Sequence, residues 1–280
     1  MGKSPIAAME GVVMKLWVSA LVLPALLAAC GGGGTSGPED EGLSEQERLE
    51  LSVGIWTGVA TFDGSFEQSD SLVALSYDDR FLTVQDSIIG ELVYDSRFEI
   101  VDEYDDDGTL VLVTDSTAKM YRMGAATDVT VDMQSVSVPQ VSILGQYQDT
   151  QGISGTVALE REGILNESGT MARIATGWGS PTSERAIQVN ADGLFSGRHD
   201  GCQLQGTLAE TAGAPRDPVT LGLGLYTLEM TLSGCDNSAR DGTYDGLAGV
   251  VSLPTFGGLR LYLMAVNDSH AFAFPFGPKQ

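Results

Sequence analysis

The residues most capable of chemistry lie together in one short stretch, GLFSGRHDGCQLQGT, from Gly193 to Thr207. It contains His199, one of only two histidines in the chain, and Cys202, one of only three cysteines, with Asp200 between them. A histidine, an acid and a thiol are the groups of general acid–base and nucleophilic catalysis. The same residues in a turn-rich context are also typical of a hairpin that a disulfide holds together.

The spacing of these groups does not favour catalysis. His199 and Asp200 are adjacent, so in an extended chain their side chains point to opposite faces and cannot form the hydrogen bond that orients a catalytic base. The sequence contains no Gly-x-Ser-x-Gly motif, and the second histidine, His270, lies in the turn-like sequence NDSH. We therefore predict that the protein is not an enzyme.

An acidic sequence, EYDDDG at residues 103–108, has the oxygen-rich composition of the first half of a calcium loop. If Glu103 were the first ligand, the twelfth position would be Thr114 instead of the glutamate that such a loop requires. The histidines and cysteines are not at zinc-ligand spacing either. The sequence predicts an acidic turn here, with no metal site and no cofactor.

The N-terminal sequence has the pattern of an export signal. Lys15 is followed by an apolar run, residues 16–27, that is too short to cross a bilayer, and the run ends in LAAC at Cys30. This ending resembles the lipobox of bacterial lipoproteins, which implies that residues 1–29 are a cleaved signal peptide and that Cys30 carries diacylglycerol. Translation starts at Met1 or at Met14. The alternative is an ordinary secretory signal, with Cys30 a spare thiol.

Residues 30–52 are rich in glycine, serine and acid and lack a periodic apolar face, which predicts a flexible tether. Within the tether, SEQE at Ser44–Glu47 has capping-box spacing and predicts a short helix that ends near Leu51. Gly31 stands where lipoproteins of the inner membrane of enteric bacteria carry aspartate. The lipobox resemblance therefore implies an anchor in the outer membrane, with the protein facing the periplasm of the cell envelope.

Beyond residue 53 the sequence consists of strand-length runs of β-branched and aromatic residues, which turn-forming residues separate. The clearest runs are residues 73–79, 80–86, 91–101, 109–114, 186–190 and 194–198. Turns are expected at NADG (190–193), HDG (199–201), PTFGG (254–258) and NDSH (267–270). Short turns enforce sequential antiparallel pairing, so we predict an all-β fold: an antiparallel meander that closes into a barrel or folds into a sandwich.

Two short sequences resemble known barrel families. GIWTG, at Gly54–Gly58, is similar to the Gly-x-Trp that opens the first strand of lipocalins. Trp178, followed by IQVNADGLFSG, resembles the opening hairpins of avidin-type barrels. These resemblances imply that Trp56 and Trp178 lie at the base of a barrel, where they could contact a ligand. The chain also resembles uncharacterised proteobacterial lipoproteins with a repeated tryptophan strand.

The β region, residues 53–280, is longer than one lipocalin or avidin barrel. A faint internal repeat offers a reason, because DDRF (78–81) follows Trp56 much as DGLF (192–195) follows Trp178. One domain is one interpretation of this region. The other is two tandem units, 53–168 and 169–280, that meet near residues 166–170.

With Cys30 lipidated, Cys202 and Cys235 remain as a pair in an oxidising compartment, and we predict a disulfide between them. Cys202 opens one strand and Cys235 closes the next, so an antiparallel pair would bring them together around a loop centred at residues 218–219. Strict alternation places Cys235 on the wrong face of its strand. A bulge at residues 233–234 would correct this.

The formal net charge of −23 excludes nucleic acid as a partner. Two functions remain open: a non-enzymatic module for interaction with an envelope protein or for structure, and a calyx that binds a small apolar or amphipathic molecule. The closing sequence AFAFPF places Phe272, Phe274 and Phe276 on one face, either as a core strand or as the floor of a ligand site. A hollow interior lined by aromatics would favour the calyx, and a filled interior would favour the interaction module.

Overall fold

The computed structural model describes residues 54–62, 68–87, 90–104, 110–114, 118–122, 125–129, 131–138, 142–149, 154–161, 170–180, 183–211, 224–253 and 258–277. The leader, Cys30, the tether with its expected helix and most of the EYDDDG turn lie outside these ranges. Within them, no helix has both the length and the apolar character needed to cross a membrane.

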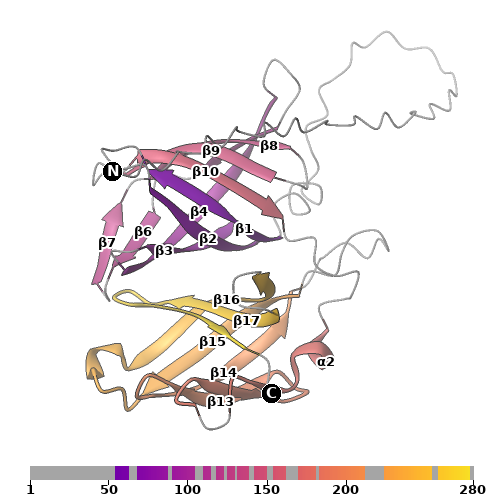
Figure 1. Cartoon of the computed structure of the whole chain (residues 1–280), viewed down its shortest axis with the longest axis vertical. Helices are drawn as coiled ribbons and strands as arrows, with labels where there is room; N and C mark the ends of the chain where they lie inside the picture. The colour runs from indigo at the N-terminus through magenta and orange to yellow at the C-terminus, as the bar shows by residue number, and fades with distance from the viewer. Residues whose placement is uncertain are drawn as a thin grey trace, which may run out of the picture. The chain divides into compact units, whose positions relative to one another are not determined.

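The prediction of an all-β fold is confirmed. The described chain forms two antiparallel sheets, with one short helix, α2 (Met171–Ile174), and one 3-10 turn, η1 (Ser238–Arg240) (Figure 1). The first sheet contains β1 (Gly54–Phe62), β2 (Gln68–Tyr77), β3 (Arg80–Ser87), β4 (Gly90–Tyr104), β5 (Leu110–Thr114), β6 (Ala118–Arg122), β7 (Ala125–Val129), β8 (Val131–Val138), β9 (Ser142–Asp149) and β10 (Ser154–Arg161).

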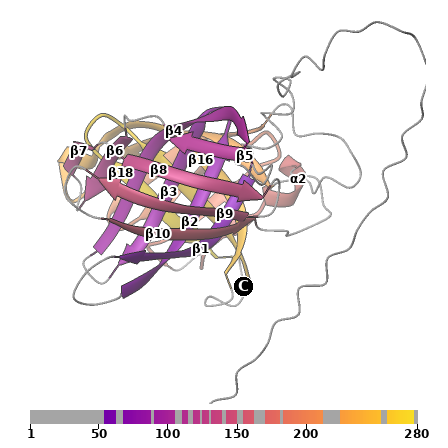
Figure 2. The ribbon, with the colours of Figure 1, turned by 90° about the horizontal axis from the view of Figure 1, so that it is seen from above.

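The first sheet closes on itself, but several of its neighbouring strands are not consecutive in the chain. Its order is β3-β2-β1-β10-β9-β8-β5-β4-β6-β7, and β3 also pairs with β4, so the pairings from β3 round to β4 form a ring. The long strand β4 pairs with β6 along residues 92–95 and with β5 along residues 98–104. In Figure 2, β8, β9, β10 and β1 lie side by side in this curved sheet, in the order of their pairings.

The second sheet follows the order of the chain, from β11 to β18. It contains β11 (Gly177–Trp178), β12 (Ala186–Val189), β13 (Leu194–His199), β14 (Cys202–Glu210), β15 (Leu225–Ser233), β16 (Gly242–Leu253), β17 (Gly258–Val266) and β18 (Ala271–Phe276). Its two ends approach one another, because the backbone N–H of Gly179 donates to the carbonyl of Gly277. The boundaries 53–168 and 169–280 remain a prediction, since residues 162–169 lie outside the described ranges.

Local turn chemistry explains the meander. The side-chain oxygen of Asn190 accepts hydrogen bonds from the backbone of Asp192 (3.0 Å) and Leu194 (2.9 Å), and Asn267 forms a similar turn with the backbone of Ser269 (2.9 Å) and His270 (2.7 Å). The turns expected at NADG and NDSH are thus confirmed. PTFGG connects β16 to β17, but its residues 254–257 are outside the described ranges.

Three main apolar clusters lie among the described residues. One fills the inside of the second sheet, and a second, around Trp56, lies inside the first. The third joins the two sheets, because it combines Leu75 and Leu82 of the first with Leu247 and Met264 of the second. Strand β2 is consequently buried on both faces: its residues contribute alternately to the second and third clusters.

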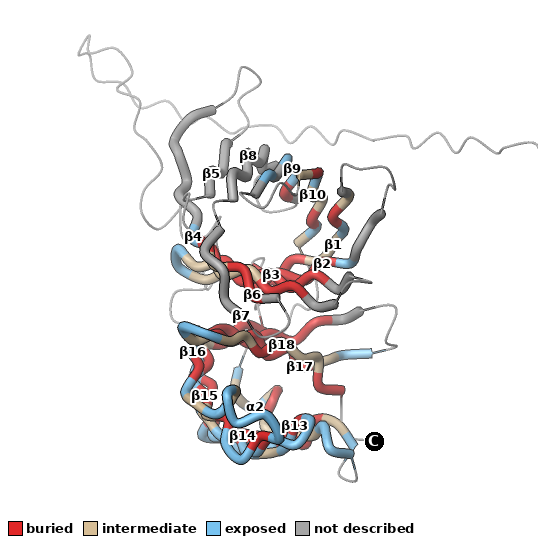
Figure 3. The backbone as a smooth tube through the Cα atoms, turned by 90° about the vertical axis from the view of Figure 1, so that its left-hand side faces the viewer, coloured by how far each residue is buried: buried red, intermediate tan, exposed pale blue. Residues whose placement is uncertain are grey.

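Polar contacts supplement this shared cluster. The guanidinium of Arg80 forms two 3.0 Å hydrogen bonds to the carboxylate of Asp95 in the first sheet and a 2.5 Å hydrogen bond to Asp245 in the second. The hydroxyl of Tyr121 donates to the carbonyl of Asn267 at 2.8 Å. The outward face is thereby covered on β16 from Leu247 onward and on much of β17 and β18. On β12 to β15 and at the start of β16 it carries exposed residues (Figure 3).

Candidate functional site

The stretch that concentrates chemical groups forms the hairpin β13–β14. His199 and Cys202 face one another across its closed end, and the two residues between them, Asp200 (φ 44°) and Gly201 (φ 77°), both have left-handed backbone conformations. This is the two-residue turn that matches the twist of an antiparallel hairpin, and glycine and aspartate tolerate it. The turn predicted at HDG is confirmed.

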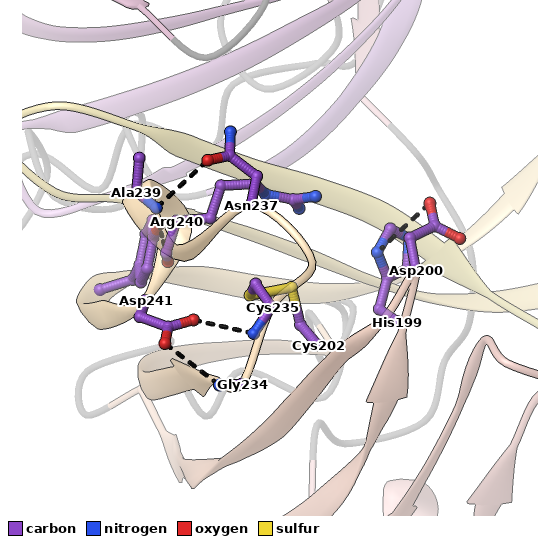
Figure 4. The surroundings of a disulfide bond; sticks show 10 residues. His199, Asp200, Cys202, Gly234, Cys235, Asn237, Ala239, Arg240 and Asp241 are labelled. Atoms are coloured by element: carbon purple, nitrogen blue, oxygen red, sulfur yellow. Dashed lines mark hydrogen bonds and ion pairs between the residues drawn. A yellow bond between two sulfur atoms is a disulfide. The ribbon is translucent and has the colours of Figure 1, made fainter.

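The predicted disulfide between Cys202 and Cys235 is confirmed (Figure 4). The ladder between β14 and β15 is regular up to the pair Gln203–Ser233. No bulge inside the ladder therefore turns Cys235 toward the face of Cys202. Instead Gly234, with φ 62°, turns the chain immediately after the strand and brings Cys235 to Cys202. The carboxylate of Asp241 holds this turn by accepting hydrogen bonds from the backbone N–H of Gly234 (3.2 Å) and Cys235 (2.9 Å).

His199 is a core residue. It is 7% exposed, and its ring contacts Phe272, Phe274 and Phe276 of β18 edge to face at centroid distances of 5.0, 4.4 and 6.1 Å. Both ring nitrogens are buried and have no hydrogen-bond partner among the described residues. Desolvation lowers the pKa of His199 to about 4, a shift that the charge of Asp200 only partly opposes. The imidazole is therefore neutral at neutral pH.

Asp200 does not orient His199 as an acid orients a catalytic base. Its carboxylate oxygen is 3.7 Å from Nδ1 of His199, which exceeds hydrogen-bond distance. The carboxylate instead accepts hydrogen bonds from Arg185 at 2.6 and 3.0 Å, and these bonds lower the pKa of Asp200. Arg185 also lies 5.4 Å from the centroid of the Phe274 ring. This arrangement is suited to fixing the hairpin to β18 and lacks a base that faces a substrate.

Trp56 and Trp178 occupy corresponding places, in the opening strands β1 and β11. The indole N–H of Trp56 donates to the hydroxyl of Ser76 at 2.8 Å, and the guanidinium of Arg161 lies 5.4 Å from its ring. The indole N–H of Trp178 donates to the carbonyl of Ile174 at 2.9 Å. Both side chains are buried. Their assignment as ligand contacts stays a prediction.

The interior of the second sheet is filled with large side chains. Phe195, Tyr226, Met230, Phe272 and Phe276 are all buried in the same cluster, and Phe274 packs against it. Phe272, Phe274 and Phe276 thus belong to a closing core strand. In the part of this sheet that the structure describes, these side chains pack into the core instead of forming the floor of a ligand site.

A hollow of about 760 Å³ lies on the outer face of the same sheet, across β12 to β16. Its side chains form two rows, because the register places outward residues of successive strands opposite one another. The first row is Gln188, Ser196, Gln205, Thr231 and Thr243. The second row is Leu194, Thr207, Glu229 and Asp245, with Asn190 beside it.

Gly206 explains why β13, β14 and β15 approach so closely beneath this hollow. A Cβ at this position would lie 2.1 Å from the carbonyl oxygen of Glu229 and 2.8 Å from the ring of Phe195. Only glycine fits that space. On either side of it, Gln205 and Thr207 point outward, as the alternation of buried and exposed residues along β14 requires.

The hollow offers hydrogen-bonding groups and little charge. Seven of the fourteen lining residues carry an amide or an aliphatic hydroxyl, and none of the described ones is Lys, Arg or His. Leu194, Phe195, Met230 and Tyr244 also line the hollow. Of its two carboxylates, that of Asp245 already accepts a hydrogen bond from Arg80. Among the described residues, no group of three or more His, Cys, Asp or Glu side chains is arranged to hold a metal ion.

Sequence reasoning missed this hollow. Alternation in LFSGRH and CQLQGT shows which residues face outward, but alignment across five strands depends on a register that the sequence does not reveal. The available signal was the near absence of large apolar residues at outward positions of β12 to β15.

No protein-family model and no curated protein matches the chain. The solved structure of immune modulator A of Aeromonas veronii is similar to 82% of this chain and 96% of its own, with 14% sequence identity and a TM-score of 0.36. At that TM-score the similarity carries no argument about function.

Proposed function

We propose that the protein is a non-enzymatic lipoprotein of the bacterial cell envelope, anchored through Cys30, whose β region is an interaction module. One observation carries this proposal: the polar hollow is on a solvent-facing sheet surface that the fold itself does not use, while the interior beneath it is filled. The lipobox resemblance supports the anchor. The net charge of −23 argues against nucleic acid and anionic lipid headgroups as partners.

Site-specific photo-crosslinking in intact envelopes tests the module. A photoreactive amino acid at position 205 lies in the hollow, and the same group at position 203 provides a matched control, because Gln203 is also exposed on the outer face of β14 but does not line the hollow. We expect adducts from position 205 and none from position 203. Absence of adducts at position 205, or equal yields at both positions, would contradict the proposal.

The first sheet offers a second candidate function, the calyx for a small apolar or amphipathic molecule. Its inner face combines small side chains, Ala60 and Ala74, with buried polar ones, Thr83 and Gln85, beside Trp56. Ligand sites often pair an apolar lining with a few polar groups. The interior of the second sheet is occupied instead by larger aromatic side chains, which pack around His199.

Tryptophan fluorescence tests the calyx. Fatty acids, haem, quinones and amphipathic dyes would quench wild-type emission, and the response would disappear in Trp56→Phe but persist in Trp178→Phe. Because the two indoles are in different sheets, the second variant is the control. A response that is absent in the wild type, or that depends only on Trp178, would count against this candidate.

A further inference from the structure

We propose that the hollow across β12 to β16 binds an uncharged, polyhydroxylated chain, that is, a neutral glycan. This inference rests on the proposed function, because it names the ligand chemistry of the same surface. Three properties of the lining support a glycan ligand: its hydrogen-bonding groups, its charge and the geometry of its two rows.

The hydrogen-bonding groups match those of a sugar. Each sugar hydroxyl both donates and accepts, and so do the hydroxyls of Ser196, Thr207 and Thr231 and the amide of Gln205. Ser and Thr side chains are short, so little rotamer entropy is lost when a ligand orders them. These hydroxyl and amide groups can therefore pair with the hydroxyls of a sugar as donors and as acceptors.

The charge of the hollow disfavours ionic ligands. A phosphate-rich or sulfated polymer would meet Glu229 and find no cation among the described lining residues. Arg80 is engaged by Asp95 and Asp245, and Arg198, the exposed cation of β13, is not part of the lining. A cationic partner would form its main ion pair with Glu229 alone. Because Glu229 is exposed, that ion pair would contribute little binding energy.

The two rows suit an extended ligand. Side chains in one row are separated by the strand spacing of about 4.8 Å, so a chain that runs across the strands meets a new polar group at each one. Leu194, 52% exposed, is in the second row and offers one apolar surface for the C–H face of a sugar ring.

Affinity electrophoresis tests the inference with the purified, delipidated chain. Gels that contain dextran, mannan or soluble β-glucan are compared with gels that contain alginate and with polymer-free gels, alongside an array of neutral oligosaccharides. We expect retardation or array binding by neutral glycans, a three- to tenfold loss of affinity in Gln205→Ala and Thr231→Ala, and no change in Gln203→Ala. Circular dichroism confirms that the variants fold.

The outcomes separate this inference from the proposed function. No binding to any neutral glycan, or equal binding by wild type and Gln205→Ala, overturns the glycan assignment. The wild type could instead bind polylysine and no neutral glycan, with the binding abolished in Glu229→Gln. That result would assign a cationic partner and also overturn the glycan assignment. In either case adducts from position 205 in the envelope would still support the interaction module, and their absence would contradict that module independently.

Discussion

His199 acquires its properties from residues far away in the chain. The sequence places it beside an acid and a cysteine, which is the chemical context of catalysis, but three phenylalanines of β18 surround its ring and exclude water. Local sequence predicted the turn at Asp200 and Gly201 because that turn depends on two residues. It could not predict the burial of His199, which depends on how β18 packs across the sheet.

The burial of His199 predicts a pH-dependent stability. Its folded-state pKa of about 4 lies below the unfolded value, so the unfolded chain binds an extra proton between roughly pH 6.5 and 4. This contribution to stability is complete above pH 6.5 and is lost as the pH falls through that window. Between pH 7 and 4.5 we expect a loss on the order of 2–3 kcal/mol from this residue.

Urea denaturation at the two pH values measures the effect. His199→Phe, which keeps an aromatic ring among the phenylalanines, should lose about 2 kcal/mol less than wild type between them. His270→Ala, measured in parallel, is the control for the second histidine. An identical pH dependence in His199→Phe and wild type would show that His199 is not buried in its neutral form.

The strand pair β14–β15 depends on its disulfide. Cys202 and Cys235 are 33 residues apart in the sequence, and closing such a loop stabilises the fold by about 3–4 kcal/mol on the chain-entropy model. The double variant Cys202→Ala, Cys235→Ala should unfold at correspondingly lower urea concentration. Cys30→Ser, which leaves the pair intact, is the control. An unchanged midpoint in the double variant, or two free thiols by peptide mapping of the exported protein, would refute the prediction.

Strands and turns were the most predictable features, because alternation and turn chemistry are local. Asn190 and Asn267 form their turns with backbone groups no more than four residues away. The row that contains Gln205 and Thr231 has no such local cause, since it requires the register of several strands. Likewise, alternation indicates one buried face for β2, whereas both of its faces are buried because the other sheet covers the second.

The cluster between the sheets predicts that they unfold together. Leu75 is fully buried in it, so Leu75→Ala should cost about 2–5 kcal/mol, the usual effect of a core cavity. In Trp56→Phe and Trp178→Phe backgrounds, the remaining indole reports on a single sheet. Leu75→Ala should lower the urea midpoint equally in both backgrounds. A shift confined to the first sheet would contradict a shared core.

The lipid anchor is the prediction that concerns the placement of the protein in the cell. Cys30→Ser should leave an unprocessed precursor or a soluble protein, because diacylation with N-acylation provides more chains than stable anchoring needs. Fractionation and intact mass measure this. A wild-type protein without acyl mass in the soluble periplasmic fraction would refute the anchor, and a Gln203→Ala protein should remain in the membrane fraction as a processing control.

The hydrogen bond from Gly179 to Gly277 has a topological consequence. This bond brings the residue after β11 next to the residue after β18, so the first and last strands of the second sheet lie close together although they form no ladder. A short linker across this seam would allow the chain to be reopened at a tight turn, such as Asp200–Gly201, without changing any strand neighbour. The second sheet is thus a candidate for circular permutation, with its architecture independent of which strand comes first.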